Sequence, residues 1–563
     1  MSLIRQKVRR LPAAAVSTDK VFPVHYWDHG YTRAIMHFML RFDSRLDTDR
    51  LRRSLERLLE RQDGWRKLGG RLRRNASGKL EYHVPAKYTM QRPAITYYHE
   101  SHDDIRIMQH PLAAHIPKAK PARTHGPRIV ARGEDFVSLM RRKEDPSSFE
   151  DYVDTDTPVL GLHIVTFRDA TLVCLRSSHL LFDAMGRKEL LDAWSLTLQG
   201  RDDEVRLLVE QDPMVSLGTA EAPGNSERST APIEKYKHAA KQLGLRQQIT
   251  LGLRQLFDMI HFRRQVKEDR IVCVPKAYFE ALRHDALAAL ETRQTKTAES
   301  HDGEGQRQCL PPKAFLSDGD VLCAWWSRHI IASRLRNAYK SGQTVCIMNM
   351  MGLRGLLAQA GLMARPTVVQ TNGEKKDSAA ALVANALVTV PTFLASRELL
   401  RKPLGHVAAM LRQSLQELGT WPQVEAFLRI QRAPHDKLVV TPALFGDVGM
   451  HLVVCTNWIK AGFFDVDFSA AIVPDEDDMT KLGGGRQKPE SPGHAIARLG
   501  KPTNVQMHTI TDYVPPFLVS PFQILGKDAY GNYWIRGTLR EEYWPKVEQS
   551  LLEEALLEHQ EAH

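Results

Sequence analysis

His179 and Asp183 are the residues whose types and spacing most clearly suggest chemistry. They follow an almost continuous apolar run at 172–175, and the aspartate stands four positions after the histidine. An imidazole held where a buried strand ends can act as a general base near neutral pH. A histidine in such a position is also often a hydrogen-bonded core residue, so the His-x-x-x-Asp pattern alone leaves both interpretations open.

The elements on either side predict how this pair is positioned. The run at 172–177 is short and mostly apolar, which favours a buried strand. Apolar residues then recur on one face of a predicted helix, at Leu190, Leu191, Trp194 and Leu198. We therefore expect His179 to lie in the turn that joins a buried strand to a helix.

Other segments predict a chain that mixes helices and strands throughout. The leucines of 49–62 repeat at helical spacing, with Asp47 or Thr48 before them as a helix cap. A strand is expected at 162–167. The segment 90–148 is rich in His, Pro, Arg and Lys with poor periodicity, and we interpret it as a long surface insertion.

A polar stretch at 199–232 is rich in Gly, Asp, Glu and Ser, which indicates a linker between two halves of similar build. We therefore predict an α/β fold with an N-terminal domain at 1–215, a linking segment at 216–270 and a C-terminal domain at 271–563. The chain has 563 residues, enough for a large core in each half.

Composition narrows the class of protein. No apolar stretch reaches the ~20 residues that a membrane span requires, and the N-terminus lacks the apolar region of a secretory signal. The six cysteines are scattered without a Cys-x-x-Cys pair, which favours reduced thiols in a cytoplasmic protein. The formal net charge of +11 would suit nucleic acid, an anionic membrane or a phosphorylated cofactor such as coenzyme A. Without zinc-finger spacing, an RNP motif or a long basic run, we expect no nucleic-acid partner.

Segment 234–270 is basic and amphipathic. It contains nine Lys and Arg residues against four Asp and Glu. One predicted helical face carries five apolar residues, at Leu245, Ile249, Leu253, Leu256 and Ile260. A helix of this kind can make weak contact with an anionic membrane surface, or it can pack on its own protein.

Several motifs, in this order, resemble those of the BAHD acyltransferases, and the fungal members that act on secondary metabolites are the most similar. The resemblance extends over most of the chain. The matching stretches are 68–74 with 78–80, His179 to Asp183, 317–328, Asn385-Ala386, Pro403-Leu404-Gly405, and Thr456-Asn457-Trp458 followed by 464–468.

The resemblance implies a two-domain fold of the chloramphenicol-acetyltransferase type, with an active-site channel at the domain interface. It implies acyl transfer from coenzyme A, most simply from acetyl-CoA, to a hydroxyl of a small secondary metabolite such as a terpenoid, polyketide or alkaloid. His179 would be the general base, without an acyl-enzyme, a permanently bound cofactor or a metal. Thr456 and Trp458 would lie near the oxyanion, although Trp458 is equally well explained as a core aromatic. The enzyme would be a monomer.

The remaining family positions carry structural roles by the same resemblance. Asp183 would turn away from the site and pair with an arginine, for which Arg354 is the candidate, rather than complete a catalytic triad. Asp467 would likewise be structural. Lys460 could contact a polar acceptor, or it is simply a solvated lysine.

Two other functions fit the same residues. A condensation-like enzyme would take its acyl group from a carrier protein, but Ser178 stands where such enzymes have a first histidine. A catalytically silent binding protein would keep the fold, and the family's DFGWG sequence is reduced here to Asp467-Phe468-Ser469-Ala470-Ala471.

Overall fold

The structure is a computed structural model of the chain. The residues that it describes are 15–31, 34–121, 126–219, 234–261, 267–299, 315–334, 341–363, 368–369, 375–376, 380–436, 443–474, 499–511 and 520–561. Cys309 and residues 220–233 and 262–266 of the predicted linking segment lie outside these ranges.

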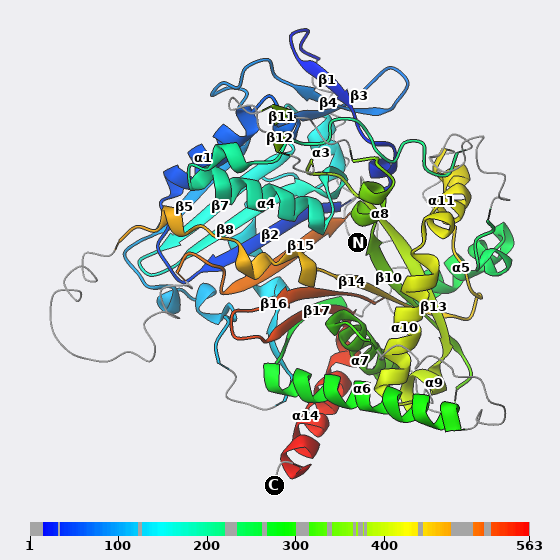
Figure 1. The fold of residues 1–563 in the computed structure, drawn as a ribbon. Helices are drawn as coiled ribbons and strands as arrows, with labels where there is room; N and C mark the ends of the chain where they lie inside the picture. The colour runs from blue at the N-terminus through cyan, green and yellow to red at the C-terminus, as the bar shows by residue number, and fades with distance from the viewer. Residues whose placement is uncertain are drawn as a thin grey trace, which may run out of the picture.

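A five-stranded sheet forms the core of the first half (Figure 1). Its strands, in spatial order, are β15 (Asn504–Thr511), β2 (Ala34–Phe42), β8 (Thr171–Ser178), β7 (Leu160–Phe167) and β5 (Thr96–His102). Only β5 and β7 pair in parallel; the other pairs are antiparallel. The central strand β8 carries the histidine at its end.

Side chains of β8 enter two different cores, which explains its nearly continuous apolar sequence. Val173 and Leu175 join the core under the helices α1 (Thr48–Glu60) and α4 (Ala184–Leu198). Leu172 and Cys174 point to the other face, which short turns and α2 (Val137–Met140) cover. The strand is therefore buried on both faces, as its sequence predicts.

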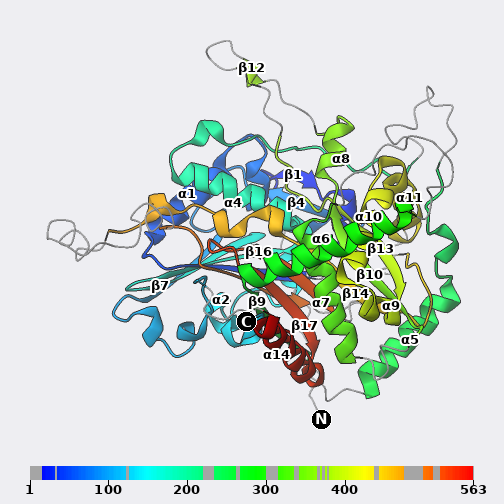
Figure 2. The same ribbon diagram turned by 60° about the horizontal axis from the view of Figure 1, so that its bottom comes forward.

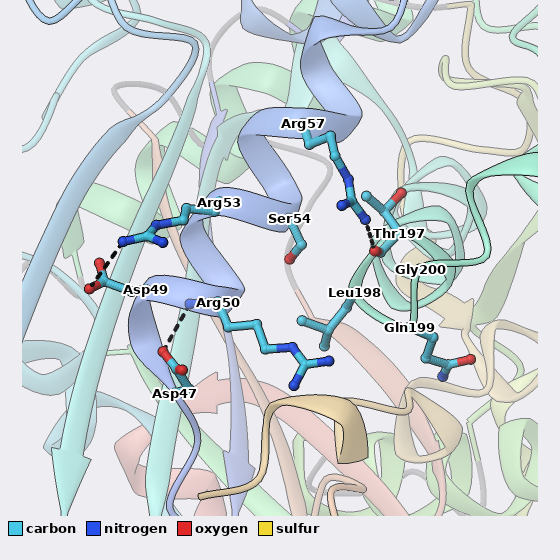
Figure 3. A pocket seen from close by; sticks show the side chains of 10 residues that line it. All are labelled: Asp47, Asp49, Arg50, Arg53, Ser54, Arg57, Thr197, Leu198, Gln199 and Gly200. Atoms are coloured by element: carbon cyan, nitrogen blue, oxygen red, sulfur yellow. Dashed lines mark hydrogen bonds and ion pairs between the residues drawn. The ribbon is translucent and has the colours of Figure 1, made fainter.

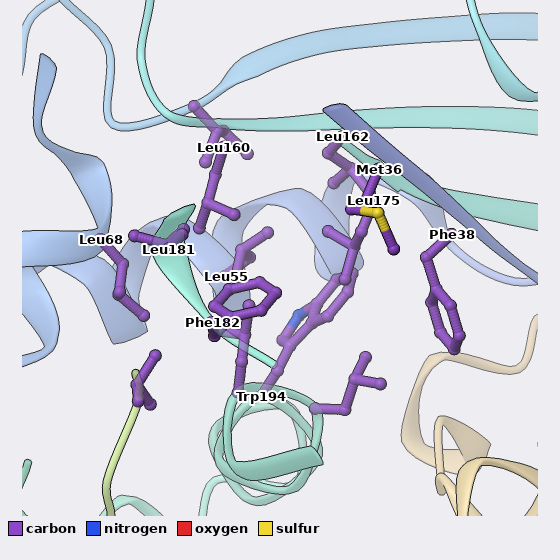
Figure 4. Packing of buried hydrophobic residues seen from close by; sticks show 14 of the residues in the cluster. Met36, Phe38, Leu55, Leu68, Leu160, Leu162, Leu175, Leu181, Phe182 and Trp194 are labelled. Carbon is purple, nitrogen blue, oxygen red and sulfur yellow. The ribbon is translucent and has the colours of Figure 1, made fainter. Parts of the chain in front are cut away.

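Trp194 anchors α4 in the first core (Figure 4). Its ring reaches from α4 toward Leu55 of α1 and the strands behind. Its indole N–H donates to the Leu51 carbonyl at 3.1 Å and to the Ser54 hydroxyl at 2.9 Å, so this buried donor is satisfied. The contact fixes α4, and with it the turn that carries His179, against α1.

A seven-stranded sheet forms the core of the second half. Its strands, in spatial order, are β13 (Leu387–Ala395), β10 (Thr344–Gly352), β14 (His451–Asn457), β16 (Pro521–Lys527), β17 (Tyr533–Arg540), β9 (Lys267–Val274) and β6 (Arg128–Arg132). One face packs against α6 (Lys276–Glu299), α7 (Asp318–Arg334), α10 (Leu404–Leu418) and α14 (Trp544–Glu561), which Figure 2 shows grouped together.

Each sheet includes one strand from the other half of the sequence. β15 pairs with β2 over eight residue pairs, although more than 460 positions separate Thr511 and Ala34. β6 pairs with β9 at the edge of the second sheet. The expectation of a surface insertion at 90–148 is therefore wrong, because β5 and β6 from this segment belong to the two main sheets. The division at 215 and 270 stays a prediction.

The remaining elements are smaller. A three-stranded sheet contains β1 (Lys20–Pro23), β4 (Leu80–Val84) and β3 (Arg71–Arg74), and a two-stranded one contains β11 (Val368–Val369) and β12 (Lys375–Lys376). The other helices are α3 (Phe149–Val153), α5 (Leu245–His261), α8 (Arg354–Gln359), α9 (Ser396–Arg401) and α11 (Trp421–Asp436). Within the described ranges, every helix is too short or too polar to cross a membrane.

Candidate active site

His179 follows the last residue of β8 and begins a single turn of 3-10 helix, η6 (His179–Leu181). The Ser178 hydroxyl accepts a hydrogen bond from the Leu180 N–H at 3.3 Å and so caps this turn. Asp183 then caps α4, accepting from the Gly186 N–H at 2.8 Å. His179 is thus held between two capped elements, at the strand end where the sequence predicts it.

Tyr31 covers one face of the His179 ring. The two rings are stacked, with their centroids 4.8 Å apart and an angle of 22° between their planes. Burial raises the pKa of the Tyr31 phenol, so this group stays protonated at neutral pH. Sequence reasoning missed Tyr31; the only signal was the density of aromatic and titratable residues in 25–31.

The surroundings of His179 favour its neutral form. Burial lowers the pKa of this imidazole, and the positive charge of Arg187 lowers it further, while Asp183 opposes the shift. Its Nδ1 is buried, and none of the described residues gives it a hydrogen-bond partner. A neutral imidazole can accept a proton, which is what a general base requires.

Asn385 fixes the backbone of the His179 turn. Its Nδ2 donates to the His179 carbonyl at 2.9 Å and to Asp28 Oδ1 at 2.9 Å, and its backbone N–H donates to the same Asp28 oxygen at 2.8 Å. Asp28 is buried, and burial raises the pKa of its carboxyl to about 7, while the Asn385 donors act in the opposite direction. Asp28 is a second residue that sequence reasoning missed.

Asp183 lies in a network of its own with Arg354. Arg354 donates Nη1 to Asp183 Oδ2 at 2.8 Å and Nη2 to Oδ1 at 2.9 Å. Oδ2 also accepts a hydrogen bond from the Ala386 N–H at 3.1 Å, and Oδ1 accepts the capping bond from the Gly186 N–H. With two donors on each oxygen, the carboxylate is occupied by groups other than the imidazole. This arrangement differs from a triad, in which the carboxylate orients the histidine.

Thr456 and Trp458 lie together at the end of β14. The Trp458 indole N–H donates to Thr456 Oγ1 at 3.0 Å, and its backbone N–H donates to the Ile524 carbonyl at 2.9 Å. Trp458 is buried and meets the Phe463 ring edge-on, with centroids 5.8 Å apart. Both N–H groups of Trp458 are therefore engaged, whereas the half-buried Thr456 hydroxyl accepts one bond and keeps its own proton to donate.

The turn after Trp458 connects this strand end to the histidine region. This turn, η9 (Ile459–Ala461), packs against α4, the helix that begins just after Asp183. Lys460 is exposed on η9. Asp467 Oδ1 accepts from the Ser469 N–H at 2.9 Å and so holds a local turn.

A groove of about 610 Å³ opens elsewhere on the first half (Figure 3). Arg50, Arg53 and Arg57 of α1 line one side, and Thr197 to Gly200, at the C-terminal end of α4, line the other. His179 precedes the opposite end of α4, and a helix of this length spans ~20 Å. The groove is therefore separate from the histidine site. The part of the chain that the structure describes holds no cluster of His, Cys, Asp or Glu suited to a metal ion.

Several known proteins match nearly the whole chain in sequence. No family model matches it. It is 34% identical to the acetyltransferase sphE of Aspergillus fumigatus, with 99% of both chains covered. It is 32% identical to the acetyltransferase adrJ of Penicillium rubens, covering 95% of this chain and 96% of that one. It is also 35% identical to a protein named transcriptional regulator calD, from Penicillium decumbens, covering 98% and 99%.

Solved structures match the fold. TRI101 of F. sporotrichioides, in complex with coenzyme A and T-2, aligns with a TM-score of 0.51 at 13% identity, covering 94% of this chain and 97% of that one. TRI101 of F. graminearum, in complex with coenzyme A and T-2 mycotoxin, gives 0.52 at 12% identity, covering 94% and 96%. The fold is therefore the two-domain fold of these enzymes.

Relatives above 30% identity over nearly the whole length, this fold, and the motifs from His179 to Trp458 agree with one another. The chain belongs to the BAHD-type, HxxxD acyltransferases of fungal secondary metabolism, and it is an acyl-CoA-dependent O-acyltransferase.

Proposed function

We propose that the enzyme transfers an acetyl group from acetyl-CoA to a hydroxyl of a terpenoid, polyketide or alkaloid, in a channel between its two halves. The observation that carries this proposal is the position of His179 at the end of β8, where burial lowers the pKa of its imidazole while Asp183 is committed to Arg354. The names of sphE and adrJ support acetyl as the acyl group. The T-2 complexes of TRI101 support a small hydroxylated acceptor.

In the proposed reaction, the His179 imidazole takes the proton of the acceptor hydroxyl as its oxygen attacks the thioester carbonyl. The new C–O bond forms and the carbonyl becomes a tetrahedral oxyanion. When the oxyanion collapses, the C–S bond breaks and the thiolate of coenzyme A takes the proton from His179. A base in this position contributes ~10²–10⁴-fold to the rate.

The oxyanion requires a hydrogen-bond donor, and we propose the Thr456 hydroxyl. The Trp458 indole N–H already bonds to Thr456 Oγ1, which directs the Thr456 proton away from Trp458. In this proposal Trp458 positions Thr456, Asp183 and Arg354 hold the turn beside the base, and Asp467 holds a turn after β14. Lys460, exposed on η9, is the candidate for contact with the acceptor.

The proposal is tested by thiol release from acetyl-CoA with a panel of hydroxylated terpenoids and polyketides. Wild type should release thiol only with an acceptor, and His179→Ala should lower the rate by ~10²–10⁴-fold. The exposed histidine in His284→Ala provides a matched control that should keep the wild-type rate. Equal rates for wild type and His179→Ala would reject His179 as the base.

The donor could instead be a carrier protein. Calorimetry with coenzyme A separates the two donors, because an enzyme that uses acyl-CoA should bind the free cofactor. Wild-type protein that binds no coenzyme A, but accepts an acyl group from a loaded carrier protein, would contradict our proposal.

The name of calD favours a second candidate, a binding protein of the same fold that carries out no transfer in the cell. Replacing the chromosomal copy with His179→Ala distinguishes the two. Loss of the acylated product with the variant protein still present supports the enzyme, and an unchanged phenotype supports the binding protein.

We infer further that the enzyme works as a monomer in the cytoplasm, with weak membrane contact through 234–270. Sedimentation equilibrium should give the mass of one chain, and a fluorescent fusion should lie in the cytoplasm, both dissolved and at the membrane surfaces that face it. A dimer mass would contradict the monomer, and fluorescence inside an organelle would contradict the cytoplasmic location.

A further inference from the structure

The helix α5 lies at the edge of the molecule in both Figure 1 and Figure 2. One side of α5 packs against the second sheet. Leu251 is 4% exposed and packs with side chains of β10 and β14, among them Met348 and Leu452. Arg254 Nη1 donates to the Val448 carbonyl at 3.0 Å, and Gln248 Nε2 donates to the Leu243 carbonyl at 2.9 Å. The helix therefore has a defined inner side.

The outer side of α5 carries an exposed apolar stripe of three residues. Leu245 is 75% exposed, Ile249 is 52% exposed and Leu253 is 60% exposed. Successive members stand four positions apart, so the stripe spans an arc of ~80° on the helix surface. Leu251 points ~160° away from the middle of this arc. The stripe thus faces away from the protein.

The charges around the stripe suit an anionic partner. Arg246 is exposed and lies beside the stripe, next to Leu253 in angular position. No acidic residue occurs in the sequence from 245 to 257, and the whole chain carries a formal net charge of +11. A cationic residue beside exposed apolar residues is a feature of helices that lie in the surface of anionic membranes.

The helix α14 provides a comparison within the same molecule. It also exposes apolar residues four positions apart, Leu552 at 58% and Leu556 at 63%. Its sequence, however, contains five glutamates and one lysine. The sequence of α5 contains two arginines and one aspartate, so an anionic surface would attract α5 and repel the acidic α14.

We infer that α5 is a peripheral anchor for an anionic lipid bilayer. Leu245, Ile249 and Leu253 insert at the boundary between headgroups and acyl chains, while Arg246 contacts lipid phosphate and carboxylate groups. The inference refines the weak membrane contact that we propose for 234–270, and it is independent of acyl transfer.

The experiment is sedimentation of the full-length protein with vesicles of phosphatidylcholine containing about one third phosphatidylserine, a strongly anionic surface. Wild type should sediment with these vesicles at low salt and be released at about 0.5 M salt. The triple variant Leu245→Gln, Ile249→Gln, Leu253→Gln should lower the partition coefficient by about tenfold or more. Arg246→Gln should lower it about threefold to fivefold.

The double variant Leu552→Gln, Leu556→Gln is the matched control, and it should bind like wild type. Absence of sedimentation by wild type, or equal binding to pure phosphatidylcholine, would overturn the inference. The inference would also be overturned if wild type were a dimer in ultracentrifugation and the triple variant a monomer, because the stripe would then be an interface between copies. Thiol release and thermal unfolding of the triple variant should match wild type. An inactive wild type would reject the proposed reaction and leave the vesicle result unaffected.

Discussion

At the residue scale, a buried cation is among the groups that lower the pKa of His179. Arg187 is 2% exposed, and its guanidinium lies over the rings of Phe38 and Phe182, at 4.9 Å and 5.2 Å from their centroids. Its charge adds to burial in lowering the pKa of His179. Arg187 therefore acts on the base through space, and this effect can be measured.

We expect Arg187→Met to shift the acid limb of the kcat/KM profile to higher pH. Removal of the positive charge makes the imidazolium less unfavourable, so the pKa of His179 rises toward its usual value and the base is protonated at higher pH. Profiles of wild type and variant between about pH 5 and 9 give the two inflections. Arg57→Met, which removes an exposed arginine, should leave the limb in place. A limb that stays fixed or moves to lower pH would contradict the assignment.

A substitution at Asp183 tests the same site through the free energy of unfolding. Asp183→Asn leaves the Arg354 guanidinium, 14% exposed, without its carboxylate. We expect a loss of ~2–4 kcal/mol in the free energy of unfolding, measured in urea. Asp467→Asn, which weakens only one local turn, should cost less than ~1 kcal/mol.

A double-mutant cycle with Arg354→Met checks that this loss belongs to the pair. The coupling energy between the two positions should exceed ~1 kcal/mol. Losses that add independently would mean that Asp183 stabilises the turn only through its bonds to Gly186 and Ala386.

Family resemblance predicted His179, Asp183 and Arg354, but not the groups that tune them. Tyr31 lies 148 positions before the histidine that it covers, and no local pattern connects the two. Nor could the sequence reveal that both N–H groups of Trp458 are engaged, because Ile524 is the acceptor on a neighbouring strand.

At the element scale, the η6 turn has only three residues, and Asn385 supplies much of what holds it. Because the asparagine bonds to the backbone of His179, we expect it to orient the imidazole through the turn rather than through contact with the acceptor. A loss here should therefore change the rate of the chemical step more than the affinity for substrates.

We expect Asn385→Ala to lower kcat by roughly tenfold, with less than about a threefold change in KM. The variant also removes the side-chain donor to buried Asp28 and leaves only the backbone N–H of residue 385 at that oxygen, so the free energy of unfolding should fall by ~1–3 kcal/mol. Steady-state kinetics and urea unfolding measure both quantities. Asn385→Asp keeps the shape and adds a charge beside Asp28, so it should be at least as harmful as alanine. A rise in KM at constant kcat would assign Asn385 to substrate binding instead.

Local patterns predicted the elements that flank the base. The helix expected at 49–62 is α1 (Thr48–Glu60), capped by Asp47, and the strand before His179 is β8 (Thr171–Ser178). Both are encoded by neighbouring residues. The strand β6 could not be predicted from neighbouring residues. Its short sequence becomes a strand only beside β9, whose pairing residues lie more than 130 positions away.

At the scale of the whole molecule, the exchange of β15 and β6 ties the two halves together. Without β15, one edge of β2 would expose eight residues of unpaired backbone. Without the first half, β9 would lose β6 as its neighbour. We therefore expect that neither half folds alone, although each has its own sheet and core.

Splitting the chain tests this expectation. Fragments 1–219 and 234–563 should each be insoluble or inactive when expressed separately, and co-expression should restore thiol release, because each fragment supplies the strand that the other lacks. Val505 is fully buried on β15 and pairs with Leu40, so Val505→Pro in the second fragment should prevent this recovery by removing a ladder hydrogen bond. A first fragment that is monomeric and cooperatively folded by itself would show that β15 is dispensable, and 1–215 would then be an autonomous domain.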